Sequence, residues 1–260
     1  MRVLVTFALE TEFAPWRNLG RFRRSSWGPI DLYVAEIGGA EVGVVLTGVG
    51  PKQAAFAAPK AIEAEHEALR FCVSSGLAGA LRPEYKIGQI LAARSVLSEK
   101  PHSEAPDRVV ESSAPLVSFA DELGATVTAN FYTAGHVVCQ ADEKRHLAHM
   151  AEAVEMESFE VLRAAALRSI PAVAIRAVSD VADEDFPLDL NRVIDDEGRV
   201  SFPRVMGQVA QYPRSIPGLI KLGRRSRRAA ESLAQFLDRY VAFVAERARN
   251  LEAQATATAS

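Results

Sequence analysis

The alternation of short β-branched apolar runs with segments of helical periodicity is the feature that most constrains the fold of this chain. Buried strands are predicted at residues 2–7, 71–74, 89–97, 127–132 and 172–178. Helices are predicted to begin near Glu10 and to span 52–65, 115–124 and 158–168. Such alternation is typical of a sheet layered with helices, so we expect an α/β fold.

The rest of the chain divides around this pattern. Residues 30–36 and 41–47 flank a Gly-Gly pair and predict a β-hairpin. The glycines of SSGLAGAL are expected to break the strand at 71–74, and the polar stretch 98–115 to form a loop. The chain has 260 residues and no convincing linker, so we expect a single domain over 1–250. A C-terminal helical extension is predicted from about residue 203, and a disordered tail over 251–260.

Charge and cysteine content exclude several classes of protein. The formal net charge is −3, which disfavours a nucleic-acid partner. The two cysteines, Cys72 and Cys139, cannot form a disulfide scaffold, and they fit a reducing cytoplasm. The N-terminus lacks the pattern of a signal peptide, and no apolar stretch approaches the length of a membrane span. We therefore expect a cytoplasmic protein.

Polar residues follow three of the predicted strands. The segments are ALETE after the first strand, SSGLAG after the strand at 71–74, and AVEMES with IRAVSDVAD around the last. Strand ends are where ligands bind in α/β sheets, because the loops there form a crevice. Simpler roles remain open: the glutamates favour a helix N-terminus, Ser179 and Asp180 can cap a helix, and the glycines can make tight turns.

No cofactor or metal site is predicted. The segment TGVGP has two glycines before a helix, but Gln53 stands where a dinucleotide-binding loop has its third glycine. His146 and His149 share a predicted helix face, but neither an H-E-x-x-H motif nor a cysteine cluster accompanies them. No G-x-S-x-G elbow occurs either, which removes the commonest signal of a serine hydrolase.

Taken whole, the stretch from VEMES through a helix to a strand ending RAVSDVAD resembles the signature region of the nucleoside phosphorylase and nucleosidase family. It is most similar to the methylthioadenosine/S-adenosylhomocysteine nucleosidases. ALETEF, TGVGPKQAA and SSGLAGAL occur in the order of that family. The resemblance implies a three-layer α/β/α sandwich with a central mixed, twisted sheet. It also implies a small-molecule purine nucleoside as partner, no cofactor, and a homo-oligomer.

The resemblance also implies roles for individual residues. Breaking a purine N-glycosidic bond leaves positive charge on the sugar and negative charge on the base, so an acid and a carboxylate are needed. Asp180 is expected to protonate the purine, oriented by Ser179. Glu157, beside Met156, is expected to hold the ribose hydroxyls. Glu12 is similar to the glutamate that activates water.

The substrate-binding positions depart from the family in part. Arg176 is expected near the carboxylates, where it balances their charge. Gly76 belongs to the glycine segment, but Leu77 stands where nucleosidases usually have a serine. Val137 and Val138 fall where the family has an aromatic side chain and a neighbouring main-chain contact to the base.

The acceptor is expected to be water. Purine phosphorylases bind phosphate with arginines, and this chain has Glu12 and Ser74 at those places. A phosphate dianion beside Glu12 would meet a like charge, which favours hydrolysis. Phosphorolysis stays the alternative, with Arg17 or Arg24 as its phosphate ligand.

The C-terminal third contains the segment PRSIPGLIKLGRRSRRAAESL, which resembles the hopanoid-associated branch of the family. That resemblance implies release of adenine from adenosylhopane, a nucleoside with a lipid tail. The basic residues of 214–228 predict either a solvated helix or a helix that docks shallowly on the inner membrane face. Routine methylthioadenosine salvage, and a scaffold role on an inactive nucleosidase fold, are the rival functions.

Overall fold

The computed structural model describes residues 1–27, 30–64, 67–98, 108–193, 195, 198 and 201–258. The strands are β1 Arg2–Phe7, β2 Arg23–Trp27, β3 Ile30–Ile37, β4 Ala40–Leu46, β5 Leu69–Ala80, β6 Ile90–Ser98, β7 Arg108–Glu111, β8 Thr126–Thr133, β9 Ala153–Glu155 and β10 Ala172–Asp180. The helices are α1 Glu10–Gly20, α2 Pro51–Ala64, α3 Ala114–Glu122, α4 Ala141–Leu147, α5 Ser158–Ala166, α6 Phe202–Gln211 and α7 Ile216–Thr258. Two short 3₁₀ turns, η1 Leu190–Arg192 and η2 Pro213–Ser215, precede and follow α6.

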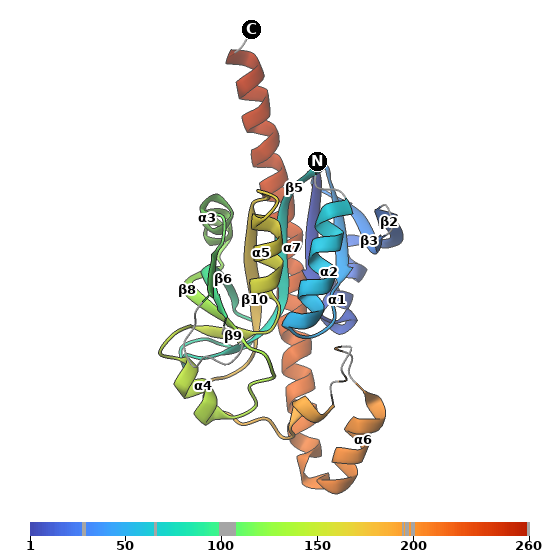
Figure 1. Cartoon of the computed structure of the whole chain (residues 1–260), viewed down its shortest axis with the longest axis vertical. Coiled ribbons are helices and arrows are strands. Elements are labelled where there is room, and N and C mark those ends of the chain that lie inside the picture. Colours follow the sequence, from blue (N-terminus) through green and yellow to red (C-terminus); the bar gives the residue numbers. More distant parts are fainter. Residues whose placement is uncertain are drawn as a thin grey trace.

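One mixed sheet organises the molecule (Figure 1). Its strand order is β10-β6-β8-β9-β5-β1-β4-β3-β2, with β7 paired to β6. An additional pairing of β10 with β5 closes five of these strands into a ring, and β1, β4, β3 and β2 extend from it. The strands β1, β4, β5 and β10 are parallel to their neighbours in this series, so their carboxyl ends meet at one edge.

Helices cover both faces of the sheet, which confirms the predicted α/β/α layering (Figure 1). Helices α1, α3 and α7 pack on one face, and α2 and α5 pack on the other. Each interface has its own apolar cluster: Phe13, Trp16 and Leu237 belong to the first, and Ile62 and Leu162 to the second. Burial of these two clusters holds the carboxyl edge of the sheet in place.

The predicted break after the strand at 71–74 is wrong. Strand β5 continues through the glycine segment to Ala80, because its residues pair with β10 along nearly the whole length. Gly76 has a φ of +148°, a value that other residues rarely adopt, so this glycine permits the strand to bend without ending. The predicted 98–115 loop contains the short strand β7; its residues 99–107 lie outside the described part.

Helix α7 also differs from the predicted extension. Its middle, between Ala229 and Ala245, is part of the main core, where Leu233, Leu237, Tyr240 and Val244 are buried against the sheet and α1. The helix continues to Thr258, into the residues for which the sequence predicts a disordered tail. The alanine, leucine, glutamate and glutamine of this segment have high intrinsic helix propensity, which accounts for the difference.

Candidate functional site

A cavity of about 530 Å³ lies at the carboxyl ends of the parallel strands. Besides Glu155, which is bound to Arg176, three carboxylates line it: Glu12 after β1, Glu157 after β9, and Asp180 at the end of β10. We call these three the carboxylate floor. The other predicted residues that line the cavity are Leu77, Val137, Val138, Met156 and Ser179. The strand-end pattern therefore brought together residues that lie up to 168 positions apart, between Glu12 and Asp180.

Glu12 both caps a helix and faces the cavity. Its Oε2 accepts hydrogen bonds from the backbone N–H groups of Ala8 and Leu9, at 3.2 and 3.3 Å. These groups precede α1, so the carboxylate satisfies donors at the helix N-terminus. Glu10, by contrast, pairs with Arg17 and does not line the cavity. The helix-end role predicted for both glutamates thus coexists with a cavity position for only one of them.

Arg176 lies beneath the cavity and has no exposed surface. It donates to Glu155 Oε2 at 2.5 Å and to Ser74 Oγ at 3.3 Å, and it lies 3.7 Å from Glu157 Oε2. Glu155 Oε2 also accepts from the backbone N–H of Glu157 and of Ser158. The ion pair of Glu155 and Arg176 thus anchors the start of α5 and fixes the backbone that carries Glu157.

The electrostatics of Glu157 follow from this arrangement. Burial, reinforced by the nearby charge of Glu155, raises the pKa of Glu157 to about 8. Arg176 lowers this pKa, as does the backbone N–H of Gly50, which donates to Glu157 Oε1 at 2.9 Å. Burial also raises the pKa of Glu12. Among the described residues, Arg176 is the one cation in an ion pair with a floor glutamate, and it is shared with Glu155.

Asp180 is held on three sides. Ser179 Oγ donates to its Oδ1 at 2.8 Å. The ammonium of Lys144, from α4, contacts its Oδ2. A Cβ placed on Gly79 would lie 2.8 Å from the same Oδ2, so only glycine leaves room for the carboxylate there. Asp180 therefore has a fixed orientation at the rim of β10.

The remaining predicted residues are placed as follows. Gly76 pairs with Arg176 in the β5–β10 register and lies under Glu12, since a Cβ there would be 3.2 Å from Glu12 Oε2. Arg17 and Arg24 lie beside Tyr33 and are not among the residues that line the cavity. The two arginines predicted as alternative phosphate ligands are thus separate from the carboxylate floor.

The C-terminal part of the chain supplies the opposite side of the cavity. Five apolar residues from the segment after β10, α6 and the first half of α7 form what we call the apolar wall: Leu190, Val193, Val205, Leu219 and Leu222. Helix α7 is fixed there by Glu184, which accepts from Lys221 and from Arg225. The hydrogen bond from Arg225 is the main reason that the pKa of Glu184 falls to about 2.

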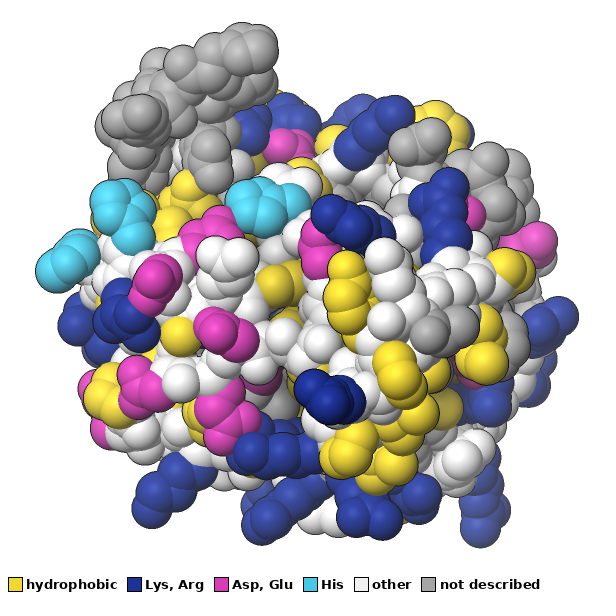
Figure 2. Space-filling model, turned by 90° about the horizontal axis from the view of Figure 1, so that it is seen from below, with side chains coloured by type: hydrophobic (Ala, Val, Ile, Leu, Met, Phe, Trp, Pro, Cys, Tyr) yellow, Lys and Arg dark blue, Asp and Glu magenta, His cyan; other side chains and the backbone are white. Residues whose placement is uncertain are grey.

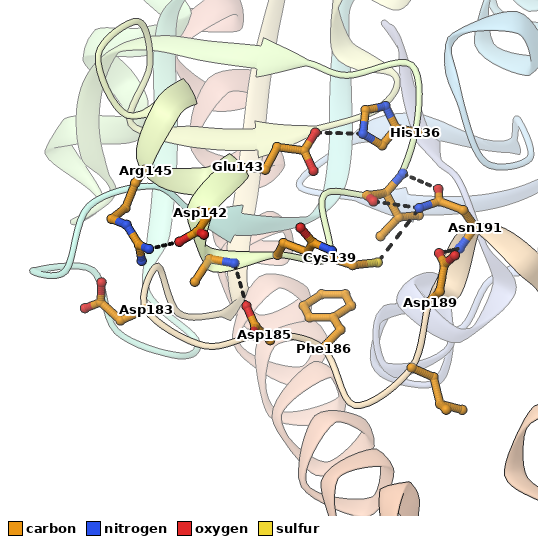
Figure 3. A pocket seen from close by; sticks show the side chains of 14 residues that line it. His136, Cys139, Asp142, Glu143, Arg145, Asp183, Asp185, Phe186, Asp189 and Asn191 are labelled. Carbon is orange, nitrogen blue, oxygen red and sulfur yellow. Dashed lines mark hydrogen bonds and ion pairs between the residues drawn. The ribbon is translucent and has the colours of Figure 1, made fainter. Parts of the chain in front are cut away.

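A second chamber of about 660 Å³ adjoins the cavity and shares His136, Val137 and Phe186 with it (Figure 3). Several of its polar side chains have partners: His136 pairs with Glu143, Arg145 pairs with Asp142, and Asp185 accepts from the backbone N–H of Ala141. No three of its groups converge on a shared point that could bind a cation, and none of the described residues form such a metal-binding group.

Three residues that matter for the site were not predicted, Lys144, Phe186 and Asn191, and a fourth, Glu155, was expected near the strand ends but was given no role. The side chain of Asn191 accepts a hydrogen bond from the backbone N–H of Val137 at 2.7 Å and donates one to its carbonyl at 2.9 Å. These bonds fix the cavity edge that includes Val138. Phe186 lines both chambers. Glu155 lies in the VEMES motif, two positions before Glu157, and this proximity was the one sequence signal that it belongs to the site. The others lie in segments that read as solvated helix or acidic loop.

Known proteins share this fold. A futalosine hydrolase mutant of Helicobacter pylori superimposes with a TM-score of 0.70 at 18% identity, covering 93% of this chain and 98% of that chain. A 5′-methylthioadenosine/S-adenosylhomocysteine nucleosidase of Neisseria meningitidis gives 0.69 at 21% identity, with coverage of 93% and 98%. The corresponding H. pylori nucleosidase, with butyl-thio-DADMe-Immucillin-A, gives 0.70 at 18%, covering 93% and 97%.

Among the described residues, no helix combines the length and the apolar character that crossing a membrane requires. The family model of the phosphorylase superfamily matches residues 2–201, which include the whole carboxylate floor. The chain therefore belongs to the phosphorylase superfamily.

Proposed function

We propose that the protein hydrolyses the N-glycosidic bond of a 5′-substituted purine nucleoside and releases adenine. In this proposal Asp180 protonates the purine, Glu157 binds the ribose hydroxyls, and Glu12 takes a proton from the attacking water. The C1′–N9 bond breaks with its electron pair going to the base, and the hydroxide oxygen of water bonds to C1′. The three carboxylates of the floor, from three separate segments, are the observation that carries the proposal.

Hydrolysis is favoured over phosphorolysis by the charges around the cavity. The floor consists of carboxylates, and its nearest arginine, Arg176, is buried and bound to Glu155. A phosphate dianion would be repelled by Glu12 and Glu157 once these ionise. Phosphorolysis of the same nucleoside remains the alternative.

The 5′ substituent is proposed to be a large apolar group, with adenosylhopane as the candidate substrate in hopanoid biosynthesis. The apolar wall supports this, because burying an apolar substituent against its side chains removes apolar surface from water and stabilises the complex. Methylthioadenosine and S-adenosylhomocysteine in salvage are the second candidates. They would leave much of this apolar surface uncovered.

The deciding experiment incubates the protein with adenosylhopane and with methylthioadenosine, each with and without inorganic phosphate. Adenine and the sugar product are separated by chromatography. We expect adenine and free ribosyl product at a rate independent of phosphate, with higher kcat/KM for adenosylhopane. A ribose-1-phosphate product, formed at a rate that rises with phosphate, would establish phosphorolysis instead.

The proposal includes contact with an anionic membrane surface on the cytoplasmic side. Figure 2 shows hydrophobic side chains next to Lys and Arg at the end of the molecule formed by α6 and the start of α7. The exposed apolar residues there are Met206, Tyr212, Ile216 and Ile220. An amphipathic surface of this composition fits the interface of anionic lipids.

Ion pairs in the structure reduce the number of basic residues that are available to contact anionic lipids. Lys221 and Arg225 bind Glu184, and Arg227 binds Glu231. Arg214 and Arg224 are exposed and, among the described residues, form no ion pair. The same holds for Arg228, so these three are the cations proposed to face the lipid.

Sedimentation with phosphatidylglycerol vesicles tests this contact. Binding is expected at low salt, and a variant with Arg214, Arg224 and Arg228 replaced by serine should lose it while still cleaving methylthioadenosine. A control that removes three exposed cations elsewhere, Arg23, Lys60 and Arg239, should still bind. Equal binding by both variants would refute the membrane contact and leave the nucleosidase proposal untouched. A homo-oligomer, expected by analogy with the family, is measured separately by light scattering.

A further inference from the structure

Lys144 is a buried cation that the proposed reaction does not yet use. It lies in the sequence Lys-Arg-His of α4, where Arg145 and His146 are exposed, whereas Lys144 has no exposed surface. Its Nζ contacts Asp180 Oδ2 and donates to the backbone carbonyl of Val181 at 2.9 Å. It also lies 5.1 Å from the ring centroid of Phe186, within the range of a cation–π interaction.

Burying an ammonium group is costly unless it is paired and hydrogen-bonded. All the contacts that pair Lys144 lie at the end of β10 or in the segment after it, around one carboxylate. A lysine has three donors and no acceptor, so Lys144 can only donate to Asp180 Oδ2. Oδ1 bonds the hydroxyl of Ser179, which can donate or accept. Oδ1 is therefore the oxygen that can carry a proton without losing its hydrogen bond.

We propose that Lys144 is a positioning residue for protonation of the leaving purine: it orients Asp180 and stabilises the carboxylate that remains after the proton has gone. This rests on the proposed function. In this step the Oδ1–H bond of Asp180 breaks and an N–H bond forms on the purine. At the same time the C1′–N9 bond breaks, and its electron pair goes to the base. The attraction between the Lys144 side chain and Asp180 strengthens as negative charge develops on Asp180.

A double-mutant cycle tests whether Lys144 acts through Asp180. Adenine release from methylthioadenosine is measured for the wild-type protein, Lys144→Met, Asp180→Asn and the double variant. We expect Lys144→Met to lower kcat by about 10²-fold, at the lower end of general acid catalysis, with little change in KM. In the Asp180→Asn background the same substitution should change kcat by less than about threefold, because the carboxylate on which it acts is gone.

Two further variants separate positioning from packing. Lys144→Arg keeps a cation beside Asp180 and should recover at least tenfold of the lost kcat, as expected if the charge matters. Arg145→Met, at the exposed neighbour, should leave kcat unchanged. Thermal unfolding checks that each variant folds. If Lys144→Met does not fold, Lys144→Gln replaces it in the double-mutant cycle.

The outcomes separate the two levels of inference. Adenine release by the wild-type protein, with equal losses from Lys144→Met in both backgrounds, would assign Lys144 a merely structural role and overturn this inference alone. Absence of adenine release from both methylthioadenosine and adenosylhopane by the wild-type protein would overturn the proposed function, and this inference with it.

Discussion

The carboxylate floor and the apolar wall face the same cavity but are built in opposite ways. Each floor residue is fixed by specific bonds: Glu12 by two backbone N–H groups, Glu157 by Gly50, and Asp180 by Ser179 and Lys144. The wall consists of aliphatic side chains with no directional bonds. Precise placement is needed where protons move, whereas an apolar substituent needs only contact area. The floor should therefore determine the reaction, and the wall should determine the choice of substrate.

Replacement of Asp180 by asparagine should give the largest effect. The side chain keeps its size but loses the proton needed by the purine, so kcat should fall by about 10²–10⁴-fold or more. The loss in kcat should be equal for 5′-methylthioadenosine and 5′-butylthioadenosine, because the carboxylate floor is not expected to contact the 5′ substituent. Adenine release measures both, with exposed Asp183→Asn as the control. Near-normal activity of Asp180→Asn would refute the assignment.

Replacement of Glu157 by glutamine should affect a charged sugar more than a neutral one. Its carboxylate attracts the positive charge that develops on the ribose, so kcat should drop by about 10²-fold with a small change in KM. Affinity for an inhibitor with a pyrrolidine in place of the ribose, as in one H. pylori complex, should drop similarly. Equal losses in KM and in inhibitor affinity would place Glu157 in ground-state binding instead.

The same inhibitor probes the raised pKa. Below about pH 8 the empty site holds a proton on Glu157. A cationic ligand favours the ionised form, so its binding should release a proton. Calorimetry in buffers of different ionisation enthalpy measures this release, which should disappear in Glu157→Gln.

The wall should respond only to the substituent. Leu222→Ser removes apolar contact worth about 1–3 kcal/mol for a well-packed chain, so kcat/KM for 5′-butylthioadenosine should fall about tenfold or more. The value for 5′-methylthioadenosine should change little. Ile220→Ser, on the exposed side of α7, is the matched control. A similar loss for both substrates would show that the wall also supports the reaction.

The raised pKa of Glu157 also predicts how stability depends on pH. The folded-state pKa of Glu157 is above its ordinary value, so between about pH 4.5 and 8 the folded protein binds more protons than the unfolded chain. Its stabilising contribution is complete below pH 4.5 and is lost as pH rises through about 8. The slope for one proton is at most about 1.4 kcal/mol per pH unit. Urea unfolding should show a shallower decline in Glu157→Gln, and an unchanged decline would contradict this pKa.

The floor could be predicted from the sequence, and most of the wall could not. The floor residues lie within a few positions of apolar strands whose ends are recognisable, and VEMES with SDVAD fixes their spacing. The role of Lys144 could not be predicted, because no periodic pattern in Lys-Arg-His distinguishes the buried lysine from its exposed neighbours. The closure of the sheet was hidden as well, since the glycines of β5 predict a turn unless the β10 partner strand is known.

Helix α7 links these two regions through its register. Leu219, Leu222 and Ser226 line the cavity, and the stripe continues through Ala229 and Leu233 into the core. Each residue advances an α-helix by about 100°, so a single insertion between Ser226 and Ala229 would rotate the wall away from the cavity. Point substitutions at the wall leave the core stripe intact. Substrate range in this protein can therefore diversify by substitution but not by changes of length, which makes positions 219 and 222 natural targets for directed evolution.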